Sequence, residues 1–315
     1  MNYYYSLNDY FKEIYGEKIY KIAIDAGLTC PNRDGTISKG GCIFCSAGGS
    51  GDFAVSRREF PTISKQIEAG INLFSGKAVG NRFVAYFQAY TNTYGPVEYL
   101  KNIFSEALLH PMIVGISVAT RPDCLGPGIL ALLKDLKSKF PEKFIWVELG
   151  LQTIHESTAD YIRRGYSLPV FEQALRDLET LFIPVIVHVI LGLPGETTRD
   201  ILETIDYLAL KNIFGIKLQL LHILKGTDLA KDYEKNPFPV YTKDEYLDLV
   251  IDCIEHLPKN VVLHRVTGDG PKNLLIAPLW SGNKKDVLNS LHRRFKERGA
   301  YQGRLFYDTG SIDSV

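Results

Sequence analysis

This chain of 315 residues has no net charge, because its 36 Lys and Arg residues are balanced by 36 Asp and Glu residues. A balanced charge gives no bulk attraction to a polyanion, so any nucleic-acid surface must be a local patch. The chain also lacks an apolar run of the ~20 residues that cross a bilayer. Its longest apolar stretch, near residues 182–191, is interrupted by Pro184 and His188. We therefore expect no membrane association.

Signals for export and for disulfide bonding are also missing. The first residues, MNYYYSLNDYFKEIYGEK, carry charges throughout and contain no apolar signal core. The five cysteines are odd in number and three of them are clustered, which argues against a disulfide framework. No GxGxxG motif follows any strand-like run, so a dinucleotide-binding fold is disfavoured. These absences indicate a cytoplasmic protein with reduced thiols.

The sequence alternates between β-rich runs and amphipathic stretches. Repeated βα units require a parallel sheet covered by helices. We predict an α/β fold, namely a partial (β/α)6 TIM-like barrel over residues 21–270. A short N-terminal extension (1–20) and a basic C-terminal extension (271–315) complete the expected organisation. The expected strands are 21–26, 83–88, 113–119, 144–150, 184–191, 215–222 and 261–266.

Polar residues follow each of these seven runs. In parallel barrels the chemistry collects at the carboxyl ends of the strands, so we expect these side chains to line a site. A cysteine-containing loop follows the first run. After the later runs come Gln88 and Thr91, Asp123 and Cys124, Gln152, the GLPGET segment, His222 and Lys225, and His264, Arg265 and Asp269.

The loop after the first run contains Cys30, Cys42 and Cys45 in the spacing C-x11-C-x2-C. Three thiolates in one glycine-rich loop can hold a metal centre and leave one coordination position open. Structural zinc is the alternative, but a closed zinc site takes four protein ligands, and the loop has no fourth Cys or His. We therefore favour an iron–sulfur cluster.

Seven motifs along nearly the whole chain resemble the radical S-adenosylmethionine (SAM) superfamily, and in particular its YtqA/YhcC-type branch. They are CPNRDG…GGCIFCSAGGSGDF, QAYTNTYGP, ATRPDC, ELGLQT, GLPGET, LHILKGT and HRVTGDGP. The commonest spacing in that superfamily is C-x3-C-x2-C, so the eleven-residue first gap is a departure. Some members of the branch, called MnmL, act in tRNA wobble-uridine modification.

The resemblance implies two cofactors. Cys30, Cys42 and Cys45 would bind three irons of a [4Fe–4S] cluster, and SAM would chelate the fourth iron. Arg164, in the segment RRGY, would pair with the SAM carboxylate. An external one-electron donor such as flavodoxin or ferredoxin would reduce the cluster. The residues expected to contact SAM are Phe44, Gln88, Ala89, Tyr90, Thr91, Ser117, Glu148, Gln152, Arg164 and Leu193.

A second set of residues is expected on the substrate side. Cys124 is either a hydrogen donor to a substrate radical or an ordinary buried thiol, and His188 is either a core histidine or a substrate contact. Cys253 differs, because it lies on a helical apolar stripe and is expected in the core. The candidate catalytic or substrate residues are Asp123, Cys124, His188, His222, Lys225, His264, Arg265 and Asp269.

The C-terminal segment has a local excess of positive charge. It is either a solvated helix face or an RNA-phosphate surface. The candidate tRNA contacts are Lys284, Lys285, Arg293, Arg294, Lys296 and Arg298.

The resemblance implies that the enzyme converts carboxymethylaminomethyl to aminomethyl at C5 of tRNA uridine 34. Two alternatives are a radical SAM enzyme for a small metabolite and a zinc-stabilised RNA-binding protein without catalysis.

Overall fold

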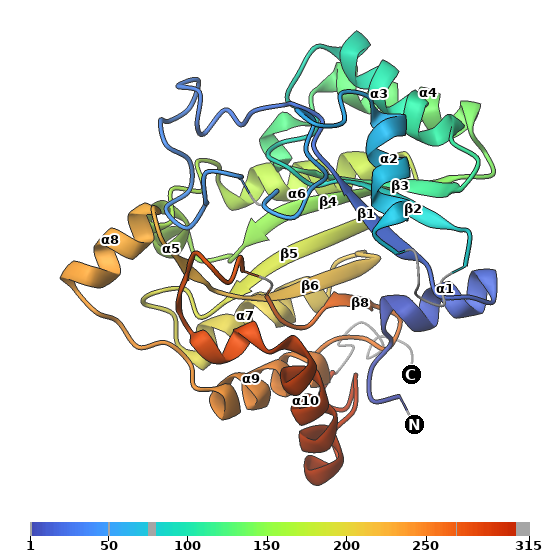
Figure 1. Cartoon of the computed structure of the whole chain (residues 1–315). Helices are drawn as coiled ribbons and strands as arrows, with labels where there is room; N and C mark the ends of the chain where they lie inside the picture. The colour runs from blue at the N-terminus through green and yellow to red at the C-terminus, as the bar shows by residue number, and fades with distance from the viewer. Residues whose placement is uncertain (1, 50, 75–79, 269, 307–315) are drawn as a thin grey trace, which may run out of the picture. The chain divides into compact units, whose positions relative to one another are not determined.

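A seven-stranded sheet runs through the chain in the order β1-β2-β3-β4-β5-β6-β8 (Figure 1). The computed structural model describes residues 2–49, 51–74, 80–268 and 270–306. Every strand expected from the sequence is present, with ends that shift by a few residues. The strands are β1 (Tyr20–Ile24), β2 (Phe83–Phe87), β3 (Ile113–Thr120), β4 (Phe144–Gln152), β5 (Val185–Leu191), β6 (Gly215–Leu220) and β8 (Val262–Arg265).

The strand pairing confirms the predicted α/β class. The pairs β1–β2, β2–β3, β3–β4 and β6–β8 are all parallel. Two short strands, β7 (Ile223–Leu224) and β9 (Leu275–Ala277), form a separate antiparallel pair. The helices are α1 (Leu7–Tyr15), α2 (Ile63–Asn72), α3 (Val97–Leu109), α4 (Pro127–Lys139), α5 (Glu156–Tyr161), α6 (Leu168–Thr180), α7 (Thr198–Ala209), α8 (Asp228–Lys235), α9 (Lys243–Glu255) and α10 (Lys284–Arg298).

The chain divides into two compact units. We call the first the cysteine-loop unit; it contains Asn8–Leu151 and Ile162–Val187. The second, the C-terminal unit, contains Met1–Leu7, Gln152–Tyr161 and His188–Val315. The cysteine-loop unit therefore holds β1 to β3 and nearly all of β4, whereas β6 and β8 belong to the C-terminal unit.

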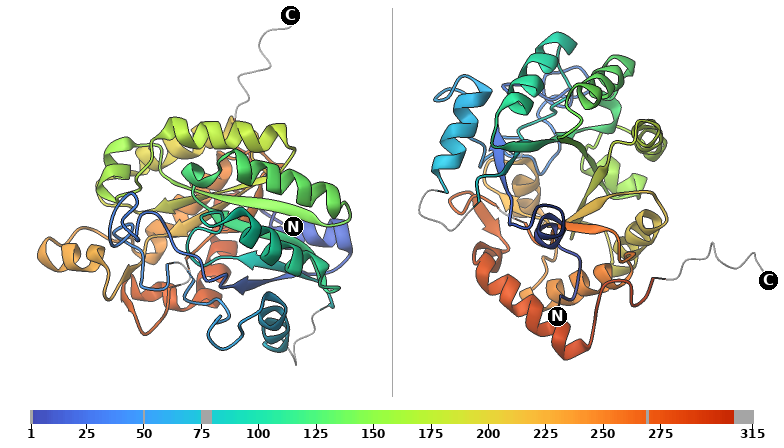
Figure 2. Two further views of the ribbon diagram at one scale, coloured as in Figure 1. Left: turned by 90° about the horizontal axis from the view of Figure 1, so that it is seen from above. Right: turned by 90° about the vertical axis from the view of Figure 1, so that its right-hand side faces the viewer.

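In the cysteine-loop unit, α2, α3 and α4 cover the outer face of the first strands (Figures 1 and 2). Each helix buries one apolar stripe, as its 3.6-residue periodicity requires. In α3 this stripe includes Leu100, Phe104 and Leu108, all fully buried. Phe104 meets Phe87 of β2 edge-on, with ring centroids 4.8 Å apart. The helices thus anchor the strands whose ends carry the cysteine loop.

Aromatic residues near the N-terminus pack in both units. In the cysteine-loop unit, Phe11 of α1 stacks on Trp146 of β4 with ring centroids 5.7 Å apart. In the C-terminal unit, Tyr3 stacks on Phe295 of α10 at 5.3 Å. The first residues are therefore ordered by tertiary packing.

The C-terminal unit contains the expected apolar stripe on α9. Cys253 is fully buried there, together with Tyr246 and Val250. This confirms that Cys253 is a core residue. No helix among the described residues combines the length and apolarity that a membrane span requires.

Candidate cofactor site

The cysteine loop connects β1 to α2 and folds back on itself between its first two cysteines. The Ile37 N–H donates to the Pro31 carbonyl (2.8 Å), and the Gly41 N–H donates to the Asn32 carbonyl (2.8 Å). Gly40 and Gly41 both have a φ of +89°, a region that strains any residue with a side chain. The residues between Cys30 and Cys42 therefore form a local loop whose two ends lie close together.

The Cys42 thiol lies in a polar, electropositive setting. Asn32 donates to its sulfur at 3.4 Å. A hydrogen bond from Cys45, the nearby Arg121 charge and the Asn32 amide lower the pKa of Cys42 to about 7, against the effect of burial. The same bond to Cys42, together with burial, raises the pKa of Cys45. Cys42 is thus more readily ionised near neutral pH than Cys45, and the thiolate is the form that binds metal.

Two buried arginines lie against the Tyr166 ring beside the cysteine loop. The guanidinium carbons of Arg121 and Arg164 each lie 4.9 Å from the ring centroid. Arg121 also makes a two-pronged bond to Asp123 (2.9 and 2.7 Å) and donates to the Arg164 carbonyl (2.9 Å). Arg164 is 1% exposed, and its guanidinium donates to the Tyr166 and Leu151 carbonyls. The expected SAM-carboxylate partner therefore also has bonds within the protein.

The three cysteines fit an iron–sulfur cluster better than a single zinc ion. The cysteine loop supplies three thiols, whereas a closed structural zinc site takes four protein ligands. Three thiols with one coordination position left open suit the three protein-bound irons of a [4Fe–4S] cluster.

Two residues expected to contact SAM, Tyr90 and Gln152, have strained backbone conformations. Among the described non-glycine residues, Tyr90, Gln152, Arg163 and Phe182 have positive φ values of 63°, 71°, 57° and 52°. Gln152 belongs to the C-terminal unit, and its Oε1 is buried without a hydrogen-bond partner. Such strain and an orphaned acceptor are typical of ligand sites. Both observations support the expected cofactor role of Gln152.

The segment after β2 is bonded to the cysteine loop. The Tyr90 N–H donates to the Gly49 carbonyl (2.9 Å), and its hydroxyl donates to the Ala47 carbonyl (2.7 Å). The Thr91 N–H donates to the Thr29 carbonyl (3.2 Å). The structure thus brings the residues from Gln88 to Thr91 beside the loop that carries the cysteines. Half-buried Phe44 lies within that loop.

Glu148 has partners inside the protein. Its carboxylate is fully buried, accepts from Ser117 at 2.5 Å and forms a 2.7 Å ion pair with Lys21. Lys21 lies on β1 and Glu148 on β4, which a flat sheet would separate by about 14 Å. This pair therefore requires strong curvature of the four strands. Burial of Glu148 and Ser117 does not depend on a ligand, and their contact with SAM stays a prediction.

Several expected site residues belong to the C-terminal unit. His222 is half-buried, and its Nε2 lies 3.0 Å from the Ser281 hydroxyl. Because that hydroxyl donates to the Pro278 carbonyl (2.8 Å), His222 Nε2 is the donor in their bond. His188, His264 and Arg265 are half-buried, Leu193 is buried and Lys225 is exposed. Asp269 lies outside the described residues.

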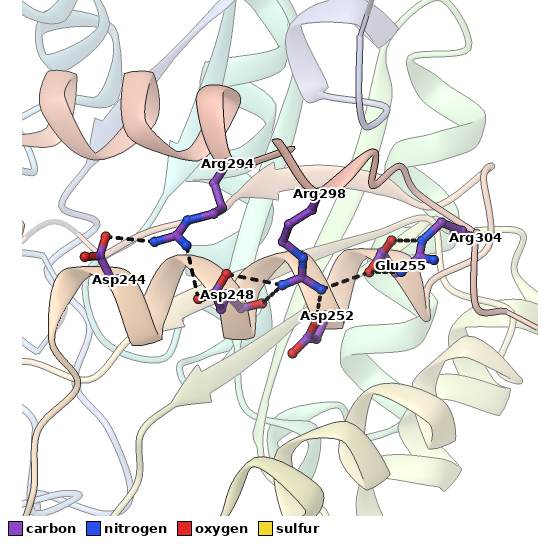
Figure 3. Close-up of polar contacts among 7 residues, drawn as sticks. All are labelled: Asp244, Asp248, Asp252, Glu255, Arg294, Arg298 and Arg304. Atoms are coloured by element: carbon purple, nitrogen blue, oxygen red, sulfur yellow. Dashed lines mark hydrogen bonds and ion pairs between the residues drawn. The ribbon is translucent and has the colours of Figure 1, made fainter. Parts of the chain in front are cut away.

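The basic C-terminal segment divides into two sets. Arg294 and Arg298 lie one turn apart on α10 and pair with acidic residues of α9, as Figure 3 shows. Arg298 reaches Asp252 at 2.5 Å and the fully buried Glu255 at 3.3 Å. Lys284, Lys285, Arg293 and Lys296 are exposed. The structure thus gives Arg294 and Arg298 a packing role, and the exposed set is the part suited to RNA.

The sequence reasoning did not include Lys21, Asn32, Arg121 or Tyr166 among the site residues. Arg121 directly follows β3 in the ATRPDC motif, which was a usable signal. Lys21 and Glu148 are charges within otherwise apolar strands, and such charges are stable only when paired. Nothing in the sequence indicated that Tyr166 would contact two arginines.

Comparison with protein families gives two matches. Residues 30–208 match the family described as Radical SAM superfamily, and residues 213–297 match the Radical SAM C-terminal domain. The chain is 43% identical to the Bacillus subtilis protein YtqA, covering 96% of this chain and 92% of that protein. It is 36% identical to Escherichia coli YhcC, covering 92% of each.

Solved structures share the fold. The archaeal Elp3 of Methanocaldococcus infernus superposes with a TM-score of 0.67 at 15% identity, covering 94% of this chain and 68% of that chain. Coproporphyrinogen III oxidase (HemN) of Escherichia coli, described as a radical SAM enzyme, gives 0.51 at 15% identity, covering 78% and 54%. These likenesses confirm the predicted partial parallel barrel.

Proposed function

Because this chain belongs to the radical SAM superfamily, we propose that it modifies the wobble uridine of tRNA. It is a radical SAM enzyme, and its cofactors are a [4Fe–4S] cluster and SAM. The observation that carries the proposal is the loop of Cys30, Cys42 and Cys45, which provides three thiols and leaves a coordination position open. The modification we propose is conversion of carboxymethylaminomethyl to aminomethyl at C5 of uridine 34.

The cluster and SAM would supply the radical chemistry, and the protein would bind and orient them. A reduced [4Fe–4S] cluster supplies the electron that cleaves SAM to methionine and a 5′-deoxyadenosyl radical, which removes a substrate hydrogen. Cys30, Cys42 and Cys45 would hold the irons. Gln152 would offer its unpartnered Oε1 to a SAM donor group. Asn32 would keep the 162–166 segment against the cysteine loop through its bond to the Arg163 carbonyl (2.6 Å).

The name of one of two distant relatives supports the choice of substrate. Elongator complex protein 3 of Schizosaccharomyces pombe is 22% identical over 84% of this chain, which spans 55% of that protein. A Methanocaldococcus jannaschii protein named tRNA uridine(34) acetyltransferase is 23% identical over 59% of this chain and 33% of that protein. The resemblance to the MnmL group points to the same nucleotide.

The proposed reaction suits a carbon beside an amine. Removing hydrogen from the methylene between nitrogen and carboxylate gives a stabilised radical. Loss of a proton and of one electron, taken up by a flavodoxin- or ferredoxin-type carrier, then gives an imine, and water releases the aminomethyl group and glyoxylate. The substrate carboxylate requires a cation, which Arg265 or Lys225 would supply, and His222 or His264 would handle protons. The anticodon base must leave its stack to be reached.

The nucleoside product tests this assignment. The cluster-loaded enzyme, incubated with SAM, reductant and tRNA carrying carboxymethylaminomethyluridine, should convert that nucleoside to aminomethyluridine. Chromatography of the digested tRNA measures the conversion. A substrate nucleoside that persists while SAM is cleaved would exclude the wobble-uridine assignment and favour a small metabolite. A colourless protein with about one zinc per chain would indicate the non-catalytic alternative.

The exposed part of the basic C-terminal segment is proposed to contact tRNA phosphates. If Lys284, Lys285, Arg293 and Lys296 neutralise about four phosphates, log affinity should fall against log salt with a slope near −3 to −4. Changing all four to Glu should flatten this slope, as measured by fluorescence anisotropy at several salt concentrations. An unchanged slope would show that these four residues form a solvated helix face and do not contact tRNA phosphates.

A further inference from the structure

A pocket of about 530 Å³ lies beside the cysteine loop within the cysteine-loop unit. Its wall includes Ile37 of that loop, Tyr94 and Val97 after β2, and Asp123 and Cys124 after β3. Pro31, which directly follows Cys30, also lines it. The volume falls within the range of ~300–1,000 Å³ that is typical of small-ligand sites. The pocket therefore adjoins the candidate cofactor site and is large enough for a ligand.

The walls of the pocket are mainly apolar and partly open to solvent. Ile37 is 46% exposed and Val97 is 38% exposed, so both offer unburied apolar surface. The Tyr94 hydroxyl bonds the Thr36 hydroxyl at 2.8 Å, which links its ring to the cysteine loop. A ligand with apolar faces would cover this surface, and an open mouth admits a ring that remains attached to a polymer.

The pocket offers no unneutralised charge to a ligand. Asp123 is paired with Arg121 through two bonds of 2.9 and 2.7 Å. Burial and the Asp123 carboxylate raise the pKa of the Cys124 thiol to about 12, so this thiol remains neutral at physiological pH. A neutral ligand is therefore favoured over a phosphate or a carboxylate, which would require an available cation.

Hydrogen-bond donors are present where two helices begin. The first turns of α3 and α4 line the pocket through Val97 and Gly128, and neither helix has a side-chain cap. A Cβ placed on Gly128 would lie 3.4 Å from the Val97 side chain, so the two helix starts are adjacent. Figures 1 and 2 show α3 and α4 side by side. The N–H groups that open α3 and the Gly128 N–H lack intrahelical acceptors and suit carbonyl oxygens. At the start of α4, Pro127 has no N–H and the Ile129 N–H donates to the Gly126 carbonyl (2.9 Å).

We propose that this pocket binds a nucleobase of the substrate RNA, with its faces against the apolar walls and its carbonyl oxygens at the helix starts. A pyrimidine base is planar, neutral and edged with carbonyl groups, as the pocket requires. Stacking of an unpaired base on aromatic and apolar side chains is a common source of RNA affinity. This inference rests on the proposed function and adds where the protein binds part of the RNA.

Val97→Glu tests the pocket, with Val170→Glu as its matched control. Val97 opens α3 and Val170 is the third residue of α6; they are 38% and 36% exposed. An acidic residue suits the first turn of either helix, so both variants should fold. The measurement is anisotropy of a labelled anticodon stem–loop bound to the cluster-loaded protein. Val97→Glu should weaken binding roughly 5- to 150-fold, the usual effect of losing one stacked base, and Val170→Glu should not.

A series of RNAs with single abasic sites identifies the base. One abasic position should weaken RNA binding to the wild-type protein as much as Val97→Glu does. In the Val97→Glu variant, the same abasic position should cause no further loss of affinity. If Val97→Glu fails to fold, Gly128→Phe fills the same pocket, because the Gly128 Cβ position meets only an ordinary contact with Val97.

The outcomes separate this inference from the proposed function. Equal RNA affinity of the wild type and both pocket variants would overturn the pocket assignment and leave the tRNA substrate standing. The pocket assignment would also be overturned if every abasic position weakened RNA binding by the same factor in Val97→Glu as in the wild-type protein. Absence of RNA binding by the wild-type protein would overturn the tRNA substrate, and the pocket assignment with it.

Discussion

Replacing Cys30, Cys42 or Cys45 by Ala is expected to abolish the iron–sulfur cluster and cleavage of SAM. A [4Fe–4S] cluster held by three protein thiolates has no spare protein ligand, so loss of one sulfur leaves a second iron without protein support. The effect should be the same at all three positions, because each change removes one of the three protein ligands. The iron content after anaerobic reconstitution should fall from about four atoms per chain to well below one.

Cys253→Ala provides the control for these variants. Its thiol is fully buried on α9, so the change should lower the free energy of unfolding by about 1–2 kcal/mol through a small cavity. Iron content and 5′-deoxyadenosine production should match the wild type. A full cluster in Cys42→Ala, or an equal loss of iron in Cys253→Ala, would contradict the assignment of the three ligands.

Glu148→Ala is expected to lower the free energy of unfolding by about 3–5 kcal/mol. The change leaves Lys21, whose side chain is 16% exposed, without its 2.7 Å ion-pair partner. It also removes the acceptor of the Ser117 hydroxyl. Breaking a largely buried ion pair is far more costly than loss of an exposed pair, which is usually worth less than 1 kcal/mol. Urea unfolding followed by circular dichroism measures the change.

Two further variants separate stability from SAM binding at Glu148. Replacing both partners, in Lys21→Met with Glu148→Leu, should recover much of the lost stability because no charge remains buried. Glu148→Gln keeps a hydrogen-bond acceptor and should destabilise less than Ala. Calorimetric titration of SAM into Glu148→Gln then tests the cofactor contact. Full stability in Glu148→Ala would show that the buried pair does not support the fold.

The strands could be predicted because their signal is local. Each expected strand is a short apolar, β-branched run, and parallel strands buried on both faces require such runs. The order of these runs and the helical stripes between them specified the α/β class. The core position of Cys253 followed in the same way from the three- and four-residue spacing of its neighbours.

The charged residues were harder to interpret, because the meaning of a charge depends on its partner. The run from Lys284 to Arg298 reads as one basic surface in the sequence. In the structure, Arg294 and Arg298 face a row of carboxylates that α9 repeats at four-residue intervals, from Asp244 to Asp252 (Figure 3). This acidic row is distant in sequence from the basic segment. Only the packing of α9 against α10 could therefore show which basic residues are paired and which are exposed.

The sequence by itself predicted the class of chemistry, because three cysteines in one loop after the first strand suit a metal centre whatever the surrounding packing. Tertiary structure decided which polar groups stand around those thiols. Arg121 and Tyr166 meet beside Cys42 because β3 and the segment after α5 converge there. Lys21 reaches Glu148 because four strands curve enough to bring β1 opposite β4. Such contacts depend on the curvature and register of a whole sheet, which no local pattern of residues encodes.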